Sequence, residues 1–282
     1  MVSLYDTFKC YNHSIKGNKI IGGTFMKRHY FQSETLTLSY LDNEQVGKPI
    51  IVCLHGLFGS ATYFSTLLNL KEFHVFSLDQ RGHGFSDHAS SQAYTIQHFV
   101  QDFYAFYKQV VKTQEFVVVG HSLGGIVAYH AAAVCPDIKK IILEDIGAIE
   151  KDDCSFAAEL DRSFLTLQQL NDKLAQFHLK DSVYFLERTT QKEEGWCFQF
   201  DAKHAQKIQH NLNGNHWETL LKSSCPILLL HGKKSWVISN EHALEIEKKR
   251  PHTKTIVLEE ATHTINLDAP NLYLQHILAF LK

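Results

Sequence analysis

The sequence predicts an α/β domain with a doubly wound, mostly parallel β-sheet and helices on both faces. Two observations support this prediction. Short apolar runs rich in Val, Ile and Phe recur along the chain, and stretches of helical length separate them. Near-continuous hydrophobic strands indicate a sheet that is buried on both faces, which requires parallel strands joined by crossover helices. In such a domain the active site lies at the carboxyl ends of the strands.

Eight strands are expected in this sheet. The first two, HYFQS and LTLSYLD, have the pattern of an antiparallel hairpin that opens the domain. Six buried runs follow: PIIVCLHG (49–56), FHVFSLD (73–79), EFVVVG (115–120), KKIILED (139–145), CPILLLHG (225–232) and KTIVLE (254–259). The stretches between them predict helices near 60–70, 94–112, 123–134, 239–250 and 270–281.

One long segment interrupts the alternation of strands and helices. From about residue 148 to 216 the chain is polar and helix-prone and has no strand-like run. Because this segment separates two strands of the same sheet, we interpret 148–216 as a helical cap inserted above the active site. The core is therefore expected in two parts, 28–147 and 217–282, preceded by a polar N-terminal extension over residues 1–27.

Composition and charge argue against several classes of function. The formal net charge is −2, so we expect no basic surface for nucleic acid or anionic lipid. No run approaches the ~20 apolar residues of a membrane span, and the N-terminus lacks a signal-peptide core, so we expect a cytoplasmic protein without a membrane segment. The six cysteines have no CxxC pair, which indicates reduced thiols and neither a disulfide framework nor a zinc site.

The strongest local motif is Gly-His-Ser122-Leu-Gly-Gly, which directly follows the strand EFVVV and precedes the helix-prone IVAYHAAAV. This strand–turn–helix context is that of a nucleophile elbow. A serine in so sharp a turn adopts strained backbone angles, so the residues two positions away must be small. We therefore predict that Ser122 is a nucleophile and that the backbone N–H of Leu123 lies at a helix N-terminus.

The run His55-Gly-Leu57-Phe-Gly-Ser comes directly after the first long buried strand. Acyl transfer needs two backbone donors for the developing oxyanion, one after the nucleophile and one from an earlier loop. We predict that the N–H groups of Leu57 and Leu123 are these donors. An ordinary strand-to-helix turn would also have such a sequence.

A second glycine-rich loop, DQRGHGFSD (79–87), follows the next strand. Its acids and its histidine are candidates for catalysis. We interpret them instead as structural groups, with Arg81, His83 and Asp87 fixing the loop by hydrogen bonds.

The catalytic base is expected after the acid, in the chain order Ser, Asp or Glu, His. His263 lies in the loop between the last strand and the last helix, where the base belongs. His231 and His242 are rivals, but His231 ends a strand beside a glycine, which favours a structural role.

The acid is not at its usual place. In the turn after CPILLLHG, Ser235 occupies the position where an aspartate is expected, and serine cannot stabilise an imidazolium as a carboxylate does. The preceding strand ends in Glu144-Asp145, and neighbouring strand ends converge on one crevice. Alternation along the strand separates the two side chains. We therefore predict Asp145 as the acid, with Glu144 as the alternative.

These motifs occur in the order and spacing of the α/β-hydrolase superfamily, and the sequence resembles that superfamily over residues 28 to 282: HGLFGS, DQRGHGFSD, GHSLGG, ILEDIGA, HGKKSWV and ATHTINLDAP. It resembles in particular the small bacterial carboxylesterases and acyl-CoA thioesterases. The resemblance implies the α/β-hydrolase fold and a triad aspartate after the sixth strand, which falls on Asp145. Thr262 and the Ile146–Ala148 segment depart from the glycine and proline usual there.

The predicted function is therefore a serine hydrolase that cleaves esters or thioesters of small acyl substrates through Ser122, His263 and Asp145, without a metal or cofactor. Hydrolysis of a lactone, an amide or a carbon–carbon bond would use the same triad. A protein of this fold that binds a small ligand without catalysis is the alternative from a different class.

Overall fold

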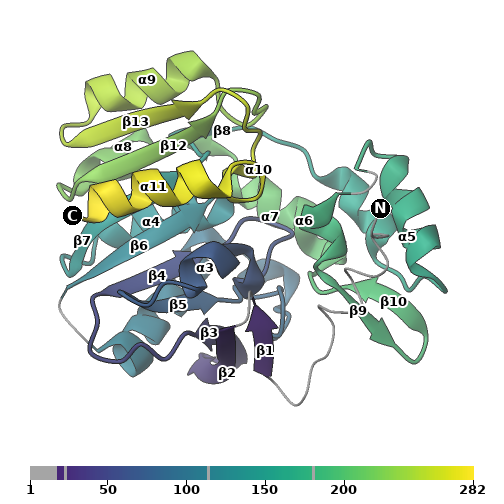
Figure 1. Ribbon diagram of the computed structural model, residues 1–282. Coiled ribbons are helices and arrows are strands. Elements are labelled where there is room, and N and C mark those ends of the chain that lie inside the picture. Colours follow the sequence, from purple (N-terminus) through teal and green to yellow (C-terminus); the bar gives the residue numbers. More distant parts are fainter. Residues whose placement is uncertain (1–17, 22–23, 113–114, 180–181) are drawn as a thin grey trace.

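The computed structural model describes residues 18–21, 24–112, 115–179 and 182–282. Its centre is a nine-stranded sheet with the strand order β1-β2-β3-β5-β4-β6-β7-β12-β13. The strands are β1 (Asn18–Ile21), β2 (Thr24–Ser33), β3 (Leu36–Asp42), β4 (Ile50–Leu54), β5 (His74–Leu78), β6 (Phe116–His121), β7 (Ile138–Glu144), β12 (Ile227–Gly232) and β13 (Thr253–Leu258). Figure 1 shows the sheet crossing the molecule from β13 to β1.

The eight strands from β2 to β13 correspond to the eight predicted strands. The pairs from β5 through β4, β6, β7 and β12 to β13 are all parallel, whereas β2 and β3 join antiparallel at one side. The mostly parallel eight-stranded sheet is thus confirmed. β1 adds a ninth, antiparallel strand at the edge.

The start of the sheet corrects one prediction. The sequence assigned residues 1–27 to an extension, but 18–21 and 24–27 form β1 and the beginning of β2, and Met26 is fully buried. A four-residue strand is too short to be told from a loop by its hydrophobic pattern. Residues 1–17 lie outside the described part of the chain.

Helices cover both faces of the sheet. Among them, α3 and α8 pack on α4, and α2 contacts α11; α11 lies in front of the sheet in Figure 1. Outside the insertion the helical elements are η1 (Ala61–Phe64), α2 (Ser65–Leu68), η2 (Ser91–Ala93), α3 (Ile96–Phe106), η3 (Tyr107–Val111), α4 (Leu123–Ala132), α8 (Trp217–Lys222), α9 (Asn240–Lys249), α10 (Ile265–Asp268) and α11 (Pro270–Leu281).

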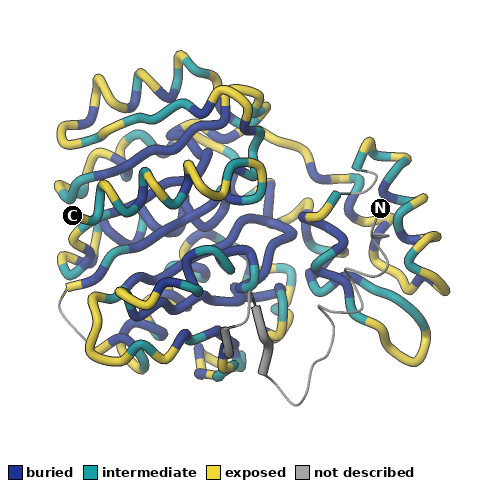
Figure 2. Tube along the Cα trace, in the orientation of Figure 1, coloured by how far each residue is buried: buried dark blue, intermediate teal, exposed yellow. Residues whose placement is uncertain are grey.

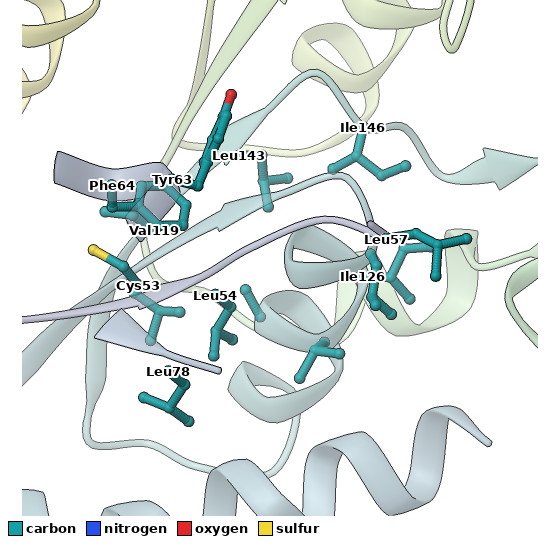
Figure 3. Close-up of a cluster of buried hydrophobic side chains, with 14 of the residues drawn as sticks. Cys53, Leu54, Leu57, Tyr63, Phe64, Leu78, Val119, Ile126, Leu143 and Ile146 are labelled. Atoms are coloured by element: carbon teal, nitrogen blue, oxygen red, sulfur yellow. The ribbon is translucent and has the colours of Figure 1, made fainter. Parts of the chain in front are cut away.

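The core follows the inner parallel strands β4, β5, β6, β7 and β12, which are mostly buried, whereas the edge strand β13 is only partly buried (Figure 2). The part of the core beneath the predicted site includes Cys53, Leu78, Val119, Ile126 and Leu143 (Figure 3). These residues come from four strands and from α4, so the same packing that stabilises the sheet also fixes the positions of the strand ends.

Most of the insertion, with α5, α6, β9 and β10, lies beyond one end of the sheet, on the right in Figure 1. Its elements are β8 (Ile149–Glu150), η4 (Ser155–Leu160), α5 (Leu167–Ala175), α6 (Val183–Leu186), β9 (Thr189–Lys192), β10 (Gly195–Phe198), η5 (Ala202–His204), α7 (Ala205–Leu212) and β11 (Gly214–Asn215). β8 and β11 pair with each other near the two ends of the segment. The antiparallel hairpin of β9 and β10 was not predicted, because we interpreted the whole segment as helical.

Within the described ranges, no helix is both long enough and apolar enough to cross a membrane.

Candidate active site

Ser122 stands in a strained turn between β6 and α4. Its backbone has φ 51° and ψ −120°, a combination that a non-glycine residue adopts only when its surroundings impose it. The flanking glycines leave no room for a side chain: a Cβ on Gly120 would lie 2.4 Å from the carbonyl oxygen of Gly124, and one on Gly124 would lie 1.9 Å from that of Leu54. The local geometry is therefore that of a nucleophile elbow.

Asp145 and His263 are in contact. Asp145 follows β7 directly and has a φ of 50°, and His263 lies in the loop after β13. The carboxylate Oδ2 is 2.7 Å from the His263 Nδ1. Of the two acids proposed from the sequence, Asp145 is thus the one beside the imidazole.

The serine and the imidazole belong to the same corner of the molecule. The ring of His121, which precedes Ser122, lies 4.6 Å from the ring of His263, and its Nε2 is 3.0 Å from the His263 carbonyl oxygen. The Ser122 N–H donates to the carbonyl oxygen of Glu144, one residue before Asp145. Among the described residues no hydrogen bond joins the Ser122 hydroxyl to His263, a bond that in ligand-free enzymes often forms only with substrate.

Asp145 is almost surrounded by donors. Its Oδ1 is 2.8 Å from the His231 Nδ1 and accepts the Gly232 N–H at 3.1 Å, while Oδ2 also accepts the Ser235 hydroxyl. Burial favours the protonated carboxyl, but the hydrogen bonds and the charge of the imidazole outweigh burial and lower the pKa of Asp145 to about 2. The carboxylate is therefore ionised at neutral pH.

Glu144 faces away from this cluster. Its carboxyl accepts hydrogen bonds from the Tyr63 hydroxyl and from the Asn266 N–H, the latter at 2.8 Å. Full burial raises its pKa to about 8, although these donors partly offset the effect. The alternation of side chains along β7 therefore separates the two acids, as expected.

The loop after β4 approaches the serine closely. A Cβ on Gly56 would lie 2.9 Å from the Ser122 Cβ, so only glycine allows this approach. Leu57 follows, and Phe58 adopts a positive φ of 67°. The carbonyl oxygen of Leu57 accepts the Tyr184 hydroxyl of α6 at 2.8 Å, which ties the loop to the insertion. Leu123, the other predicted donor, is the first residue of α4.

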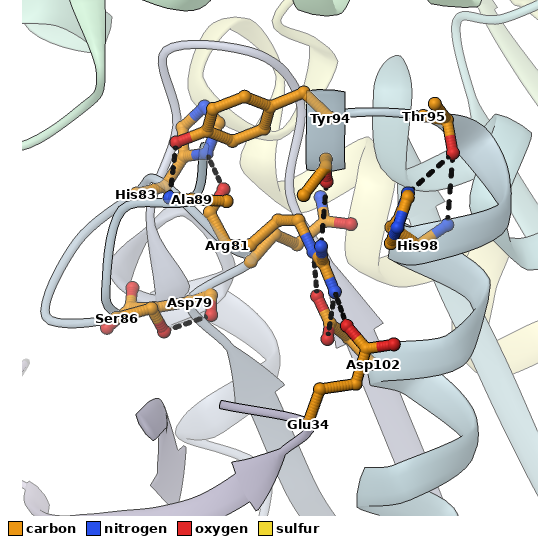
Figure 4. Close-up of polar contacts among 12 residues, drawn as sticks. Glu34, Asp79, Arg81, His83, Ser86, Ala89, Tyr94, Thr95, His98 and Asp102 are labelled. Carbon is orange, nitrogen blue, oxygen red and sulfur yellow. Dashed lines mark hydrogen bonds and ion pairs between the residues drawn. The ribbon is translucent and has the colours of Figure 1, made fainter. Parts of the chain in front are cut away.

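The loop 79–87 is held by hydrogen bonds, as predicted (Figure 4). Arg81 forms a bidentate ion pair with Asp102, with N–O distances of 2.6 and 2.7 Å. His83 bonds through Nδ1 to the Arg81 carbonyl oxygen, and the Asp87 carboxylate accepts the Thr37 N–H at 2.7 Å. The rival His242 is likewise structural, because its Nε2 accepts the Ala148 N–H.

Sequence reasoning missed three roles in this corner. We assigned His231 a structural role without a partner, and its partner is Asp145. Ser235 stands where an aspartate is usual, and its hydroxyl donates to Asp145 at the end of the neighbouring strand β7. Tyr184 lies 127 residues from Leu57, and no pattern along the chain connects them.

The described part of the molecule contains no group of three or more His, Cys, Asp or Glu side chains arranged to hold a metal ion. The five cysteines in this part are free thiols.

Comparison with known proteins agrees with the fold. A mouse protein named as the sn-1-specific diacylglycerol lipase ABHD11 is 28% identical over 276 residues, covering 87% of this chain and 85% of its own. The crystal structure of E-2-(acetamidomethylene)succinate hydrolase superposes with a TM-score of 0.79 at 20% identity, covering 91% of this chain and 99% of that one. A marine microorganism esterase has a TM-score of 0.72 at 24% identity, with coverages of 86% and 98%.

A family model described as the alpha/beta hydrolase fold matches residues 49–201, which include the elbow, Asp145 and most of the insertion. The matched span is more than half of the chain. The protein belongs to the α/β-hydrolase family.

Proposed function

We propose that the protein is a serine hydrolase that cleaves carboxylic ester or thioester bonds through a Ser122–His263–Asp145 triad. The observation that carries the proposal is the contact between Asp145 and the His263 Nδ1 beside a strained serine elbow. A carboxylate on Nδ1 fixes the imidazole tautomer that leaves Nε2 free to accept a proton.

In the proposed reaction the Ser122 hydroxyl attacks the acyl carbon while its proton passes to the His263 Nε2. The carbonyl π electrons move to oxygen and form a tetrahedral oxyanion. As this collapses, the bond to the leaving alcohol or thiol breaks and His263 returns the proton to that group. Water, deprotonated by His263, then attacks the acyl-enzyme, and a second collapse releases the acid and restores the Ser122 hydroxyl. The ionised Asp145 stabilises the imidazolium in both halves.

The N–H groups of Leu57 and Leu123 are the proposed oxyanion donors. Leu123 begins α4, where backbone N–H groups have no partner within the helix, and Leu57 lies in the loop that touches the serine through Gly56. One such donor contributes about 3–4 kcal/mol to lowering the barrier.

The names of two similar proteins support ester bonds as the substrate class, since one is a diacylglycerol lipase and the other an esterase. A serine at position 235, in place of the usual aspartate, would favour a protein that binds a ligand without catalysis. However, Ser235 donates to the carboxylate of Asp145, which contacts His263.

The acid assignment separates the proposal from its rivals. With p-nitrophenyl esters as substrates, Asp145→Asn is expected to lower kcat by about 10⁴-fold, since the amide cannot hold the required tautomer. Glu144→Gln is the matched control on the same strand and should change kcat by less than about threefold. Full activity in Asp145→Asn would contradict the proposed triad.

A further inference from the structure

Arg188, just after α6 in the insertion, has N–H groups without a hydrogen-bond partner among the described residues. It is fully buried. Its Nη1 donates to the Tyr184 carbonyl oxygen at 3.0 Å and to the Glu187 carboxylate at 3.2 Å. Within the described part of the chain, neither Nε nor Nη2 has a hydrogen-bond partner. Burying charged N–H groups without acceptors is costly, so natural proteins rarely leave them so.

The two unused groups form one edge of the guanidinium plane. Arg81 in the same protein shows what this edge binds, because its Nε and Nη2 donate side by side to the two carboxylate oxygens of Asp102 at 2.6 and 2.7 Å. Such paired donors match the two oxygens and the single negative charge of a carboxylate. Arg188 therefore presents an edge shaped for a carboxylate that no described residue supplies.

The edge lies close to the proposed catalytic residues. The Arg188 guanidinium is 4.9 Å from the centre of the Tyr184 ring and 5.8 Å from that of Tyr63. Tyr184 donates its hydroxyl to the carbonyl oxygen of Leu57. The Tyr63 ring stacks 4.6 Å from the ring of His121, the residue before Ser122. Tyr184 thus separates Arg188 from the loop after β4 that carries the proposed donor Leu57, called here the oxyanion loop. Tyr63 separates Arg188 from His121 at the elbow.

Neither tyrosine hydroxyl forms a hydrogen bond with Arg188. The Tyr63 hydroxyl donates to Glu144 and the Tyr184 hydroxyl to Leu57, so the rings offer the guanidinium only their faces. The positive charge of Arg188 also acts on His55, which follows β4. Burial lowers the pKa of His55 to about 3, and His83 and Arg188 contribute to lowering it. A ligand carboxylate at Arg188 would compensate this local positive charge.

We propose that Arg188 binds a carboxylate on the substrate, so that the preferred substrates are esters or thioesters that carry a second, non-reacting carboxylate. This inference rests on the proposed function and narrows its substrate class. The bound carboxylate would fix the substrate beneath the insertion while the reacting carbonyl lies at Ser122.

The test uses pairs of esters that differ only in this charge. Mono-p-nitrophenyl esters of dicarboxylic acids from glutarate to suberate are compared with the same esters whose free carboxylate carries a methyl group. Rates with Ser122→Ala are subtracted as background. Wild type is expected to have the higher kcat/KM for the charged member at one or more chain lengths.

Arg188→Gln should then lower kcat/KM for that charged ester about 10- to 100-fold, the loss expected for hydrogen bonds to a charged group, and change the neutral partner by less than about threefold. Arg188→Lys keeps the charge and loses the paired donors, so its kcat/KM for the charged ester should lie between those of wild type and Arg188→Gln. Arg162→Gln is the matched control, because it removes an exposed arginine of the same insertion. The inference would be overturned if the ratio of kcat/KM for the charged ester to that for the neutral ester were the same in Arg188→Gln as in wild type.

A binding measurement covers failure of the variant to fold and separates the two proposals. Ser122→Ala, with Arg188 intact, is titrated calorimetrically with methyl hydrogen adipate and with dimethyl adipate. Tighter binding of the charged compound supports the carboxylate site even if wild type hydrolyses no ester, in which case only the proposed function fails. Equal binding, together with hydrolysis of neutral esters that depends on Ser122, rejects the Arg188 site and leaves the proposed function standing.

Discussion

At the scale of single residues, Asp145 is the group on which the site depends. It ends β7 and yet contacts a histidine that follows β13, two strands away in the sheet. The intervening strand β12 supplies the groups that hold its other oxygen, the His231 ring and the Gly232 N–H. Its two oxygens thus share four donors, which keeps the carboxylate ionised and its orientation fixed.

Glu144, its neighbour on β7, gives a prediction for stability. Burial raises the pKa of Glu144 from 4.5 to about 8. Below about pH 4.5 the group is protonated in both states. Between that pH and about 8 the unfolded chain loses the proton while the folded protein keeps it, so the free energy of unfolding falls by up to about 1.4 kcal/mol per pH unit.

Glu144→Gln removes this titration and can keep the acceptor for Tyr63 and Asn266. Urea unfolding at pH 5, 6, 7 and 8 should therefore show a flatter decline in the variant than in wild type. Parallel curves would mean that Glu144 is ionised in the folded protein.

The residues predicted from the sequence are those with a local signal. Ser122 lies between closely spaced glycines, and His263 follows the last strand. Asp145 was predicted because Ser235 replaces the usual aspartate and the preceding strand ends in two acids. Tyr184, His231 and Arg188 act through contacts between segments far apart in the chain, and nothing adjacent to them in the sequence reveals those contacts.

At the scale of elements, the elbow depends on the close packing of β4, β6 and α4. Gly124→Ala would place a Cβ 1.9 Å from the Leu54 carbonyl oxygen. Because this neighbour is backbone of a central strand, the helix must shift, and we expect a loss of at least about 2–3 kcal/mol in the free energy of unfolding, together with a loss of esterase activity.

Gly47→Ala serves as the control for this substitution. Its Cβ would meet nothing within 4 Å, and its positive φ of 83° is the only source of strain, so about 1 kcal/mol is expected. Chemical denaturation of both variants measures the difference. A mild effect of Gly124→Ala would show that α4 can move away from β4.

The contact between α6 and the oxyanion loop gives a second prediction at this scale. Tyr184→Phe removes the hydroxyl that donates to the Leu57 carbonyl oxygen at 2.8 Å and keeps the ring. A less fixed loop should bind the oxyanion more weakly, so kcat is expected to fall about tenfold while KM changes little. Steady-state kinetics with p-nitrophenyl butyrate test this; an unchanged kcat would show that the loop is held by other contacts.

Element prediction succeeded where the hydrophobic pattern was strong. Eight of the nine strands of the main sheet were predicted, and the six parallel ones among them were recognised because buried parallel strands are near-continuous apolar runs. The hairpin β9–β10 and the edge strand β1 were missed. All three of these strands have four residues, and in so short a segment pairing with a neighbouring strand decides the structure.

At the scale of the whole molecule, the fold separates two tasks. The sheet and its helices fix the strand ends that carry Ser122 and the proposed acid and base, Asp145 and His263. The insertion adds two groups next to them: Tyr184, which donates to the Leu57 carbonyl oxygen, and Arg188, whose Nε and Nη2 have no partner among the described residues. We therefore expect substitutions in the insertion to change the preference among substrates, and substitutions in the core to abolish hydrolysis.

The central claim is that Ser122 is an activated nucleophile. Intact-mass analysis after incubation with a fluorophosphonate tests it most directly, because the probe reacts covalently with serines activated by a base. Wild type is predicted to gain the mass of one probe, Ser122→Ala to gain none, and Asp145→Asn to react much more slowly. Folded wild-type protein that gains no mass, or a Ser122→Ala variant that is labelled as fast as wild type, would contradict the claim.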